Sequence, residues 1–181
     1  SDLRLGLKRV TLAASRDDGY PALTGVLMEF TSSALKLVAS DGFRLSMRYV
    51  PLLQPVKHPF SVIVSAWALE KLMHILSRRN EPVTISMASG WMVFTLRDTV
   101  LSSKPIDSTF PNYRRIISAS ARAHHTRAVI NRGELLQACK RAAAISTDFM
   151  HKVRLNIESE QITVSVASAE SSKGSTTLSA S

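Results

Sequence analysis

The amino-acid sequence predicts an α+β fold built from repeated units of one helix and three antiparallel strands. Apolar residues recur at helical spacing in three segments, whose starts lie roughly 60 to 70 residues apart. Each helical segment is followed by short strand-like runs that are separated by Gly, Asp and Ser turn residues. One helix and three strands bury little alone, so we expect two units to pack side by side and close a core.

The first unit is predicted to begin with a helix over residues 3–15. Its apolar stripe repeats every three or four residues and consists of Leu3, Leu7, Val10 and Ala14. Strands are expected over residues 23–30, 35–40 and 44–50, with Asp41 and Gly42 in the last turn.

The second unit is predicted to start with a strand over residues 60–64, followed by a helix that Ser65 caps and that runs to Leu76. Leu69, Leu72, Met73 and Leu76 form its apolar stripe. Its strands are expected over residues 83–87, 91–96 and 99–104.

The third unit is predicted to open with a helix capped by Asn131, with Glu134 at the third helical position as in a capping box. Its buried side is expected to consist of Leu135, Leu136, Cys139, Ala142 and Ala143. The strands that follow are predicted over residues 153–157, 161–166 and 176–181.

This pattern predicts a complete two-unit domain over residues 1–117 and the first half of another over residues 118–181. Residues 105–123 are expected to link them, because this stretch has few helix or strand signals and contains Pro111 and several serines.

The composition points to a folded protein with an anionic partner. The 181 residues are 45% hydrophobic, which suffices for a buried core, and no apolar run approaches the roughly 20 residues of a membrane span. The 23 basic and 14 acidic residues give a net charge of +9, which favours nucleic acid over a membrane surface. A basic domain without a polyanion partner is the alternative. The single cysteine excludes an internal disulfide and fits a reducing cytoplasm.

No catalytic or metal-binding motif stands out in the sequence. Phosphate-binding glycine loops, the Gly-x-Ser-x-Gly elbow and the His-Glu-x-x-His motif are absent. The adjacent His124 and His125 do not share a helical face, and Cys139 fits a buried thiol better than a nucleophile. We therefore predict a protein that is not an enzyme and uses no cofactor and no metal.

Two segments carry a resemblance to a known family. One is Leu-Thr-Gly-Val-Leu at residues 23–27, followed by Leu-Val-Ala-Ser-Asp-Gly-Phe-Arg-Leu at residues 37–45. The other is Ser-Lys-Pro-Ile-Asp-Ser-Thr-Phe-Pro-Asn-Tyr-Arg-Arg at residues 103–115. Both resemble the bacterial replicative clamp, the beta subunit of DNA polymerase III, in order and spacing. The runs at residues 135–146 and 153–155 resemble the start of that family's third domain.

The resemblance implies a DNA-clamp fold and a processivity factor without a catalytic site. In this family each subunit has three domains, and two subunits close into a ring around duplex DNA. On this map residues 1–117 are the middle domain without its first strand, and residues 118–181 are the N-terminal half of the third domain. The implied partners are duplex DNA without sequence preference, the polymerase catalytic subunit, the clamp loader and a second subunit in the full-length ring. The implied location is the bacterial cytoplasm, associated with the nucleoid.

The resemblance also implies two sets of site residues. The set that faces DNA lies on helices and consists of Arg4, Lys8, Lys71, His74, Arg78 and Arg141. The set that binds Gln-x-x-Leu-Phe type peptides in an apolar pocket consists of Leu23, Ser40, Gly42, Phe43, Arg44, Leu45, Pro111, Arg115 and Ile116.

Each set has an alternative interpretation. The charged residues fit solvated helix faces, and Leu23 and Leu45 fit ordinary strand core. This chain also departs from the family pattern: Ser40 replaces the usual Thr, Phe43 stands where His or Tyr is common, and the fragment is basic where many clamps are acidic. A stand-alone basic nucleic-acid-binding protein of clamp-like fold is the alternative function.

Overall fold

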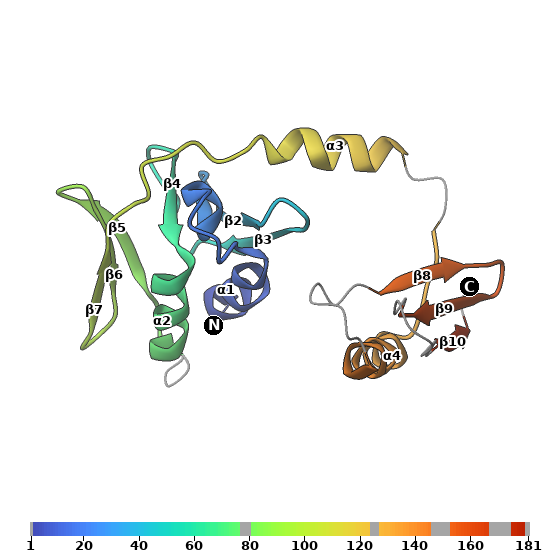
Figure 1. Ribbon diagram of the computed structural model, residues 1–181. Helices are drawn as coiled ribbons and strands as arrows, with labels where there is room; N and C mark the ends of the chain where they lie inside the picture. The colour runs from blue at the N-terminus through green and yellow to red at the C-terminus, as the bar shows by residue number, and fades with distance from the viewer. Residues whose placement is uncertain (1, 77–80, 124–126, 146–152, 167–174, 180–181) are drawn as a thin grey trace. The chain divides into compact units, whose positions relative to one another are not determined.

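The computed structural model describes residues 2–76, 81–123, 127–145, 153–166 and 175–179 (Figure 1). The chain divides into two compact units, Ser1–Ile117 and Ser118–Ser181. Helices and antiparallel sheets make up both units, which confirms the α+β class. No helix in the described ranges has the length and apolar character to cross a bilayer.

The first unit is organised around a four-stranded antiparallel sheet in the order β3-β2-β1-β4. Its strands are β1 (Gly25–Phe30), β2 (Ala34–Ser40), β3 (Leu45–Pro51) and β4 (Phe60–Ser65). In this register Leu27 of the central strand β1 lies opposite Val38 on β2 and Ile63 on β4. The second predicted unit therefore shares a sheet with the first through β4.

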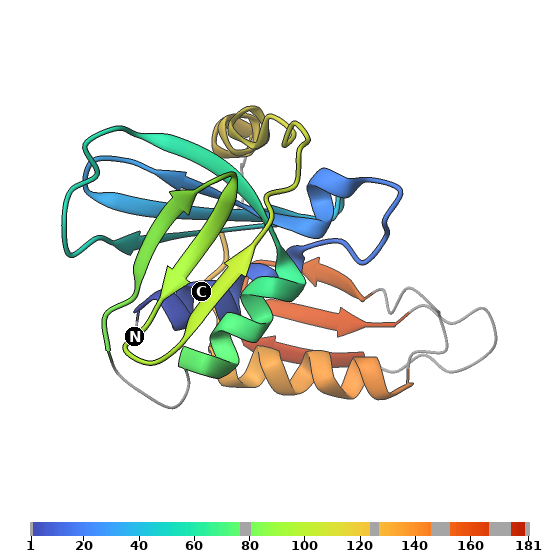
Figure 2. The same cartoon turned by 90° about the vertical axis from the view of Figure 1, so that its left-hand side faces the viewer.

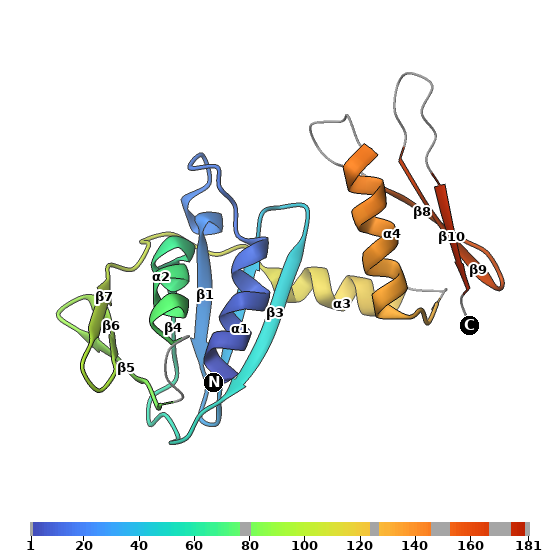
Figure 3. The same ribbon diagram turned by 90° about the horizontal axis from the view of Figure 1, so that it is seen from below.

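Two helices, α1 (Asp2–Val10) and α2 (Ala66–Leu76), cover one face of this sheet and contact each other (Figures 1 and 3). We call this side the helix face. A Cβ atom on Gly6 would lie 2.8 Å from Cγ2 of Val50 and 3.2 Å from Cδ1 of Leu37, so the missing side chain lets α1 lie close to β2 and β3. The buried core under the helices includes Leu7, Val10, Val26, Met28, Leu37, Leu69 and Leu72.

A second sheet, β5-β6-β7, extends the same core. It consists of β5 (Thr84–Ala88), β6 (Trp91–Thr95) and β7 (Val100–Ser103), seen in light green in Figure 2. Met92 and Phe94 of β6 are fully buried and join the core that α1 and α2 cover. The prediction that two helix-plus-strand units close one core is thereby confirmed.

The predicted linker contains a helix, α3 (Tyr113–Ala123), and this part of the sequence interpretation was wrong. Asn112 supplies the missed start signal, because its Oδ1 accepts a hydrogen bond from the backbone N–H of Arg115 at 3.3 Å. Pro111 lies outside the helix, where it breaks no helical hydrogen bond. The alternating alanines in the second half of the segment favour helix over loop.

The second unit contains α4 (Arg132–Ile145) and the sheet β10-β9-β8, formed by β8 (Arg154–Ile157), β9 (Gln161–Ser165) and β10 (Ser175–Ser179). Oδ1 of Asn131 accepts hydrogen bonds from the N–H groups of Gly133 at 2.8 Å and Glu134 at 3.2 Å, which confirms the predicted cap. The buried side was predicted only in part. Ala142 is buried as predicted, whereas Leu136 and Ala143 are exposed and Cys139 is half-buried. The buried stripe follows Leu135, Ala138 and Ala142.

Two further details differ from the prediction near the N-terminus. The first helix ends at Val10 and passes into a 3₁₀ turn, Thr11–Ala13, where the Thr11 hydroxyl donates to the carbonyl of Leu7 at 3.0 Å. Leu23 belongs to a second 3₁₀ turn, Pro21–Thr24, and lies just before β1. The other described elements begin and end within two residues of the predicted positions.

Candidate functional site

The side of the four-stranded sheet away from α1 and α2 carries the first group of candidate residues. Successive side chains of a strand point to opposite faces, so Lys36, Val38 and Ser40 of β2 lie opposite the helix face. Glu29 pairs with Lys36, and Leu45 pairs with Ser40, which puts both on the same side. We call this side the outer face; it is marked by Leu27, Glu29, Lys36, Val38, Ser40 and Leu45.

The start of α3 is fastened to the outer face by a charged network. Tyr113 donates a hydrogen bond to Oε2 of Glu29, and Nζ of Lys36 donates to the Tyr113 hydroxyl at 3.1 Å. Lys36 also forms an ion pair with Glu29 at 3.2 Å, and Nη2 of Arg114 donates to Oε1 of Glu29 at 2.6 Å. Tyr113 is buried, so this network fixes the first turn of α3 on the sheet.

These contacts shift the titration of the three groups. Burial opposes ionisation of Glu29, but the hydrogen bonds from Tyr113 and Lys36 outweigh it and lower the pKa of the carboxyl. The pKa of Lys36 is raised, first by its hydrogen bond with Tyr113 and then by Glu29, against the effect of burial. The pKa of Tyr113 is raised by burial and by its bond to Glu29. At neutral pH the network therefore holds a carboxylate and an ammonium.

A groove of about 750 Å³ lies between the outer face and residues 104–114. The segment is tied to the sheet where the N–H of Ile106 donates to the carbonyl of Ile63 at 2.9 Å. The groove is lined by strand residues and by this segment, among them Leu27, Glu29, Ile63, Ile106, Phe110, Pro111, Tyr113 and Arg114. Of the predicted docking residues, Pro111 alone lines it, so this groove and the predicted pocket are different surfaces.

The turn between β2 and β3 brings five of the predicted docking residues together. Gly42 has φ = +90°, which a residue with a Cβ adopts only with strain. The Ser40 hydroxyl donates to the carbonyl of Arg44 at 2.8 Å and accepts from the N–H of Gly42 at 3.1 Å. Phe43 is 90% exposed at the tip, and Leu45 closes the turn by pairing with Ser40.

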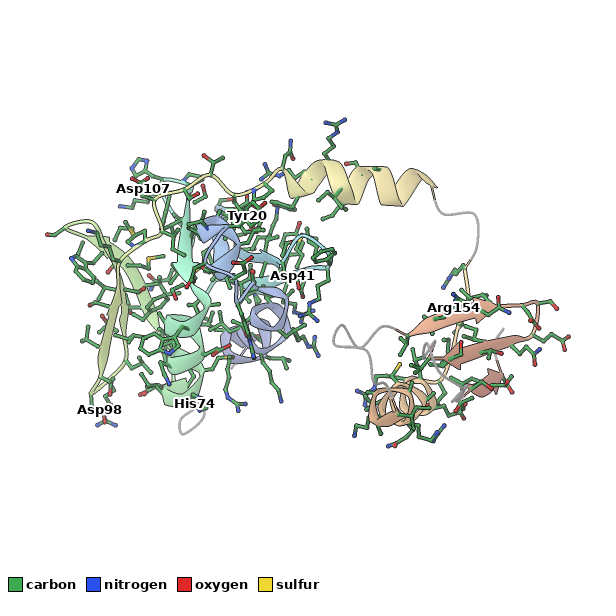
Figure 4. The ribbon with its side chains drawn as sticks, in the orientation of Figure 1. Tyr20, Asp41, His74, Asp98, Asp107 and Arg154 are labelled. Carbon is green, nitrogen blue, oxygen red and sulfur yellow. The ribbon has the colours of Figure 1, made fainter. Side chains whose placement is uncertain are left out.

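Asp41, labelled in Figure 4, stabilises this turn through hydrogen bonds to its backbone. Its Oδ1 accepts hydrogen bonds from the N–H groups of Phe43 at 3.0 Å and Arg44 at 2.9 Å, and its Oδ2 pairs with Nε of Arg44 at 2.9 Å. Burial acts against ionisation, but the backbone hydrogen bonds and the Arg44 charge lower the pKa of Asp41. The guanidinium of Arg44 is thereby held against the carboxylate of Asp41.

The remaining docking candidates form two smaller groups. Pro111, Arg115 and Ile116 lie at the start of α3, and Ile116 is 54% exposed. Leu23 is half-buried at the end of the sheet where β1 begins, and its carbonyl accepts from the N–H of Ser15 at 2.8 Å. Since α3 is anchored at Lys36, four residues before Ser40 on β2, its start lies about 13 Å along the same face from the turn.

The candidates for DNA contact lie on the helices. Arg4 and Lys8 on α1, and Lys71 and His74 on α2, are exposed on the sides of these helices that face away from the sheet core (Figure 4). Arg141 is exposed on α4, in the second unit. Arg78 lies outside the described residues. In the first unit, the described DNA candidates therefore lie on the helices that cover one face of the sheet, whereas Ser40 and Leu45 lie on the outer face.

Sequence reasoning missed the network of Glu29, Lys36, Tyr113 and Arg114. No local signal could have found it, because Glu29 and Tyr113 are 84 residues apart. The sequence offers one weak clue: Glu29 and Lys36 are each the single charged residue of a mostly apolar strand, and a charge in such a strand needs a partner.

Comparisons with known proteins agree with this architecture. The family model of the DNA polymerase III beta subunit, central domain, matches residues 1–112. The beta sliding clamp of Haemophilus influenzae is 29% identical over 169 residues, which cover 93% of this chain and 45% of that protein. The Escherichia coli K12 clamp is 31% identical over 150 residues, covering 82% and 39%. The chain spans less than half the length of these relatives.

Solved structures show the same fold. A Pseudomonas aeruginosa DNA polymerase sliding clamp, crystallised with ligand, aligns with a TM-score of 0.88 at 26% identity, over 99% of this chain and 49% of that one. A Bartonella birtlesii sliding clamp bound to griselimycin aligns with a TM-score of 0.87 at 28% identity, over 98% and 48%. The family model, residues 1–112 of 181, matches more than half of the chain, and the chain therefore belongs to the DNA polymerase III beta subunit family.

Proposed function

We propose that this chain is part of a sliding clamp, a non-catalytic processivity factor of a bacterial replicative DNA polymerase. In this proposal residues 1–117 are the middle domain, and residues 118–181 are the first half of the third domain. The full-length protein closes as a homodimeric ring around duplex DNA in the cytoplasm, at the nucleoid. The ring slides on DNA and tethers the polymerase catalytic subunit and the clamp loader.

The observation that supports the proposal is that exposed cations lie on the helices covering one face of the sheet, whereas Ser40, Leu45 and the attached start of α3 lie on the other side. A clamp must hold DNA on one side and partner proteins on the other. The exposed cations of α1 and α2 are suited to phosphates, while the exposed Phe43 in the β2–β3 turn and Ile116 on α3 are suited to apolar peptide side chains.

Docking of a short peptide follows from the chemistry of the outer residues. Leu23, Leu45 and Ile116 offer apolar area, and Arg44 and Arg115 offer charged tips on long stems. Burying one Leu and one Phe of a peptide contributes roughly 1.5 to 3 kcal/mol each before ordering costs. Such a peptide is expected to bind with a Kd on the order of micromolar.

Sliding requires weak contacts with phosphates. A closed ring stays on DNA by topology, so its residence time does not depend on tight binding. Arg4, Lys8, Lys71 and His74 would attract the backbone through charge alone and leave the base sequence unread.

The docking proposal is tested by fluorescence anisotropy of a labelled Gln-Leu-x-Leu-Phe peptide titrated with this protein. The test variant is Leu23→Asp combined with Ile116→Asp. A matched control combines Leu53→Asp with Val100→Asp, which are exposed apolar residues outside the predicted pocket. Saturable binding that only the test variant loses supports the proposal. Equal binding by both double variants, or none by the folded protein, contradicts docking at these residues.

The net charge of +9 favours a second candidate, a stand-alone nucleic-acid-binding protein of clamp-like fold. This candidate predicts tight binding to linear DNA that weakens steeply with salt. The clamp proposal predicts weak binding to linear DNA at physiological salt, because retention needs a ring. Titrations of a linear duplex at about 50 and 200 mM salt separate the two.

A further inference from the structure

Trp67 is an exposed aromatic residue that the proposed function does not use. It lies in the first turn of α2 and is 67% exposed. The buried side of this helix is already formed by Ala68, Leu69, Leu72 and Leu76, so the indole adds nothing to the core. Lys71 and His74 follow Trp67 at helical spacing, which puts all three on one exposed stripe.

The indole ring is paired with a cation. Nζ of Lys71 lies 5.2 Å from the ring centroid of Trp67, within range of a cation–π contact. A ring has two faces, and a single ammonium occupies only one of them. The exposed Trp67 therefore keeps a face on which another flat group can stack.

The charge around Trp67 favours an anionic ligand. Within α1 and α2 the exposed charged residues comprise four cations and two acids: Arg4, Lys8, Arg9 and Lys71 against Asp2 and Glu70. The two helices lie side by side on the same side of the sheet (Figure 3), so their exposed sides form a common basic surface. An aromatic platform within a basic surface matches a nucleic acid strand, which offers flat bases and phosphates together.

We propose that Trp67 stacks on an unpaired DNA base and that Lys71 contacts the phosphate next to that base. The surface of α1 and α2 then binds single-stranded DNA through stacking as well as charge. In a duplex the bases stack on each other, so no base is available to stack on Trp67. Duplex DNA is therefore bound through the cations alone. This inference rests on the proposed function, in which α1 and α2 face DNA.

Fluorescence of Trp67 tests the stacking directly. The chain has two tryptophans, so the Trp91→Phe variant leaves Trp67 as the only one. This variant is titrated with an oligo-dT strand, an abasic strand of equal length and a duplex. Stacking predicts quenching by oligo-dT and little quenching by the other two, because the abasic strand keeps the phosphates and lacks the bases.

Fluorescence anisotropy of labelled oligo-dT and labelled duplex measures the affinity of each variant for both kinds of DNA. Trp67→Ala is expected to weaken oligo-dT binding by roughly tenfold and to change duplex binding by less than about twofold. Lys71→Gln is expected to weaken the binding of both oligo-dT and duplex. Trp91→Ala, on β6, is expected to change the binding of neither. Circular dichroism confirms that each variant is folded.

The outcomes separate this inference from the proposed function. Equal quenching by the abasic strand, or equal weakening of single-stranded and duplex binding in Trp67→Ala, overturns stacking and leaves the DNA-facing surface standing. No binding of any DNA by the folded protein at about 50 mM salt overturns both.

Discussion

Arg114, in the first turn of α3, donates a hydrogen bond to Glu29 on β1, with 2.6 Å between Nη2 and Oε1. Glu29 also accepts from Tyr113 and pairs with Lys36, although its side chain is only 15% exposed. One carboxylate therefore joins three donors from two distant parts of the chain. This arrangement makes Glu29 the main attachment point of α3 on the outer face.

Replacing Glu29 by Gln should lower the free energy of unfolding by about 1–3 kcal/mol, because the half-buried Lys36 loses its counter-charge and Tyr113 loses an ionised acceptor. Urea denaturation of the two proteins at pH 7 measures the difference. Glu70→Gln, on the exposed side of α2, is the control and should change stability by less than about 0.5 kcal/mol. Equal stability of wild type and Glu29→Gln would show that the network adds nothing.

The contribution of Glu29 should also depend on pH. Its folded-state pKa is lowered from the ordinary value of 4.5, so the folded protein binds the proton less readily than the unfolded chain. The stabilisation is present above the unfolded-state pKa and is lost as pH falls through the folded-state pKa. The stability difference between wild type and Glu29→Gln should therefore shrink as the pH falls below 4.5 and through the folded-state pKa. A difference that grows on acidification would contradict the sign of this shift.

Gly25→Ala should destabilise the first unit more than Gly6→Ala. A Cβ on Gly25 would lie 2.5 Å from Cγ2 of Ile63 and 2.9 Å from the backbone carbonyl of Val64, which cannot move without breaking the β1–β4 ladder. At Gly6 the close atoms belong to side chains, which can shift. We expect a loss of about 1–3 kcal/mol for Gly25→Ala, measured by urea unfolding. The reverse order would contradict this packing.

Gly42→Ala should weaken both stability and peptide binding. Gly42 has φ = +90° in the turn that carries Phe43 and Arg44, and Gly90 has φ = +79° in the β5–β6 turn. Each substitution should cost about 1 kcal/mol of stability through the same backbone strain. Only Gly42→Ala should weaken the labelled peptide in the anisotropy titration. If Gly90→Ala weakens the peptide equally, the turn at Gly42 has no special part in docking.

Charge reversal on the helices should weaken duplex binding at low salt. Lys8→Glu and Lys71→Glu each remove a cation from the helix side, and each should also reduce the slope of log K against log salt by about one unit or more. Lys104→Glu makes the same charge change beside the groove on the outer face and serves as the control. An equal effect of all three variants would indicate that only net charge matters.

The sequence was sufficient for the helices and strands whose apolar period is strong. The strands β2 and β6 and the helix α2 show clear alternation or stripes, and their bounds were predicted within one residue. The helix α3 was missed because Pro111 and four polar residues in a short stretch resemble a loop. The apolar stripe after its cap, Asn112, is short and consists of Tyr113, Ile116 and Ile117. The attachment of α3 to the sheet through Glu29 stabilises a helix that the local apolar pattern does not predict.

The candidate site was predictable to a similar degree. The Asp41–Gly42 pair indicated a tight turn, and Gly42 at positive φ confirms its geometry. The attachment of α3 to the outer face depends on residues 84 and 85 positions apart, which no local pattern relates. Trp67 also escaped notice, because an aromatic residue in an apolar helix is expected in the core, and only the fold shows that it is exposed.

Backbone amide NMR of the labelled protein, titrated with the Gln-Leu-x-Leu-Phe peptide, locates the bound peptide on the protein. We predict chemical-shift changes that saturate and that gather at Leu23, in the turn 40–45 and in the first turn of α3. The amides of α1 and α2 should stay unchanged. Saturable shifts centred on α1 and α2, or on β5–β7, would contradict the assignment of the outer face to partner proteins.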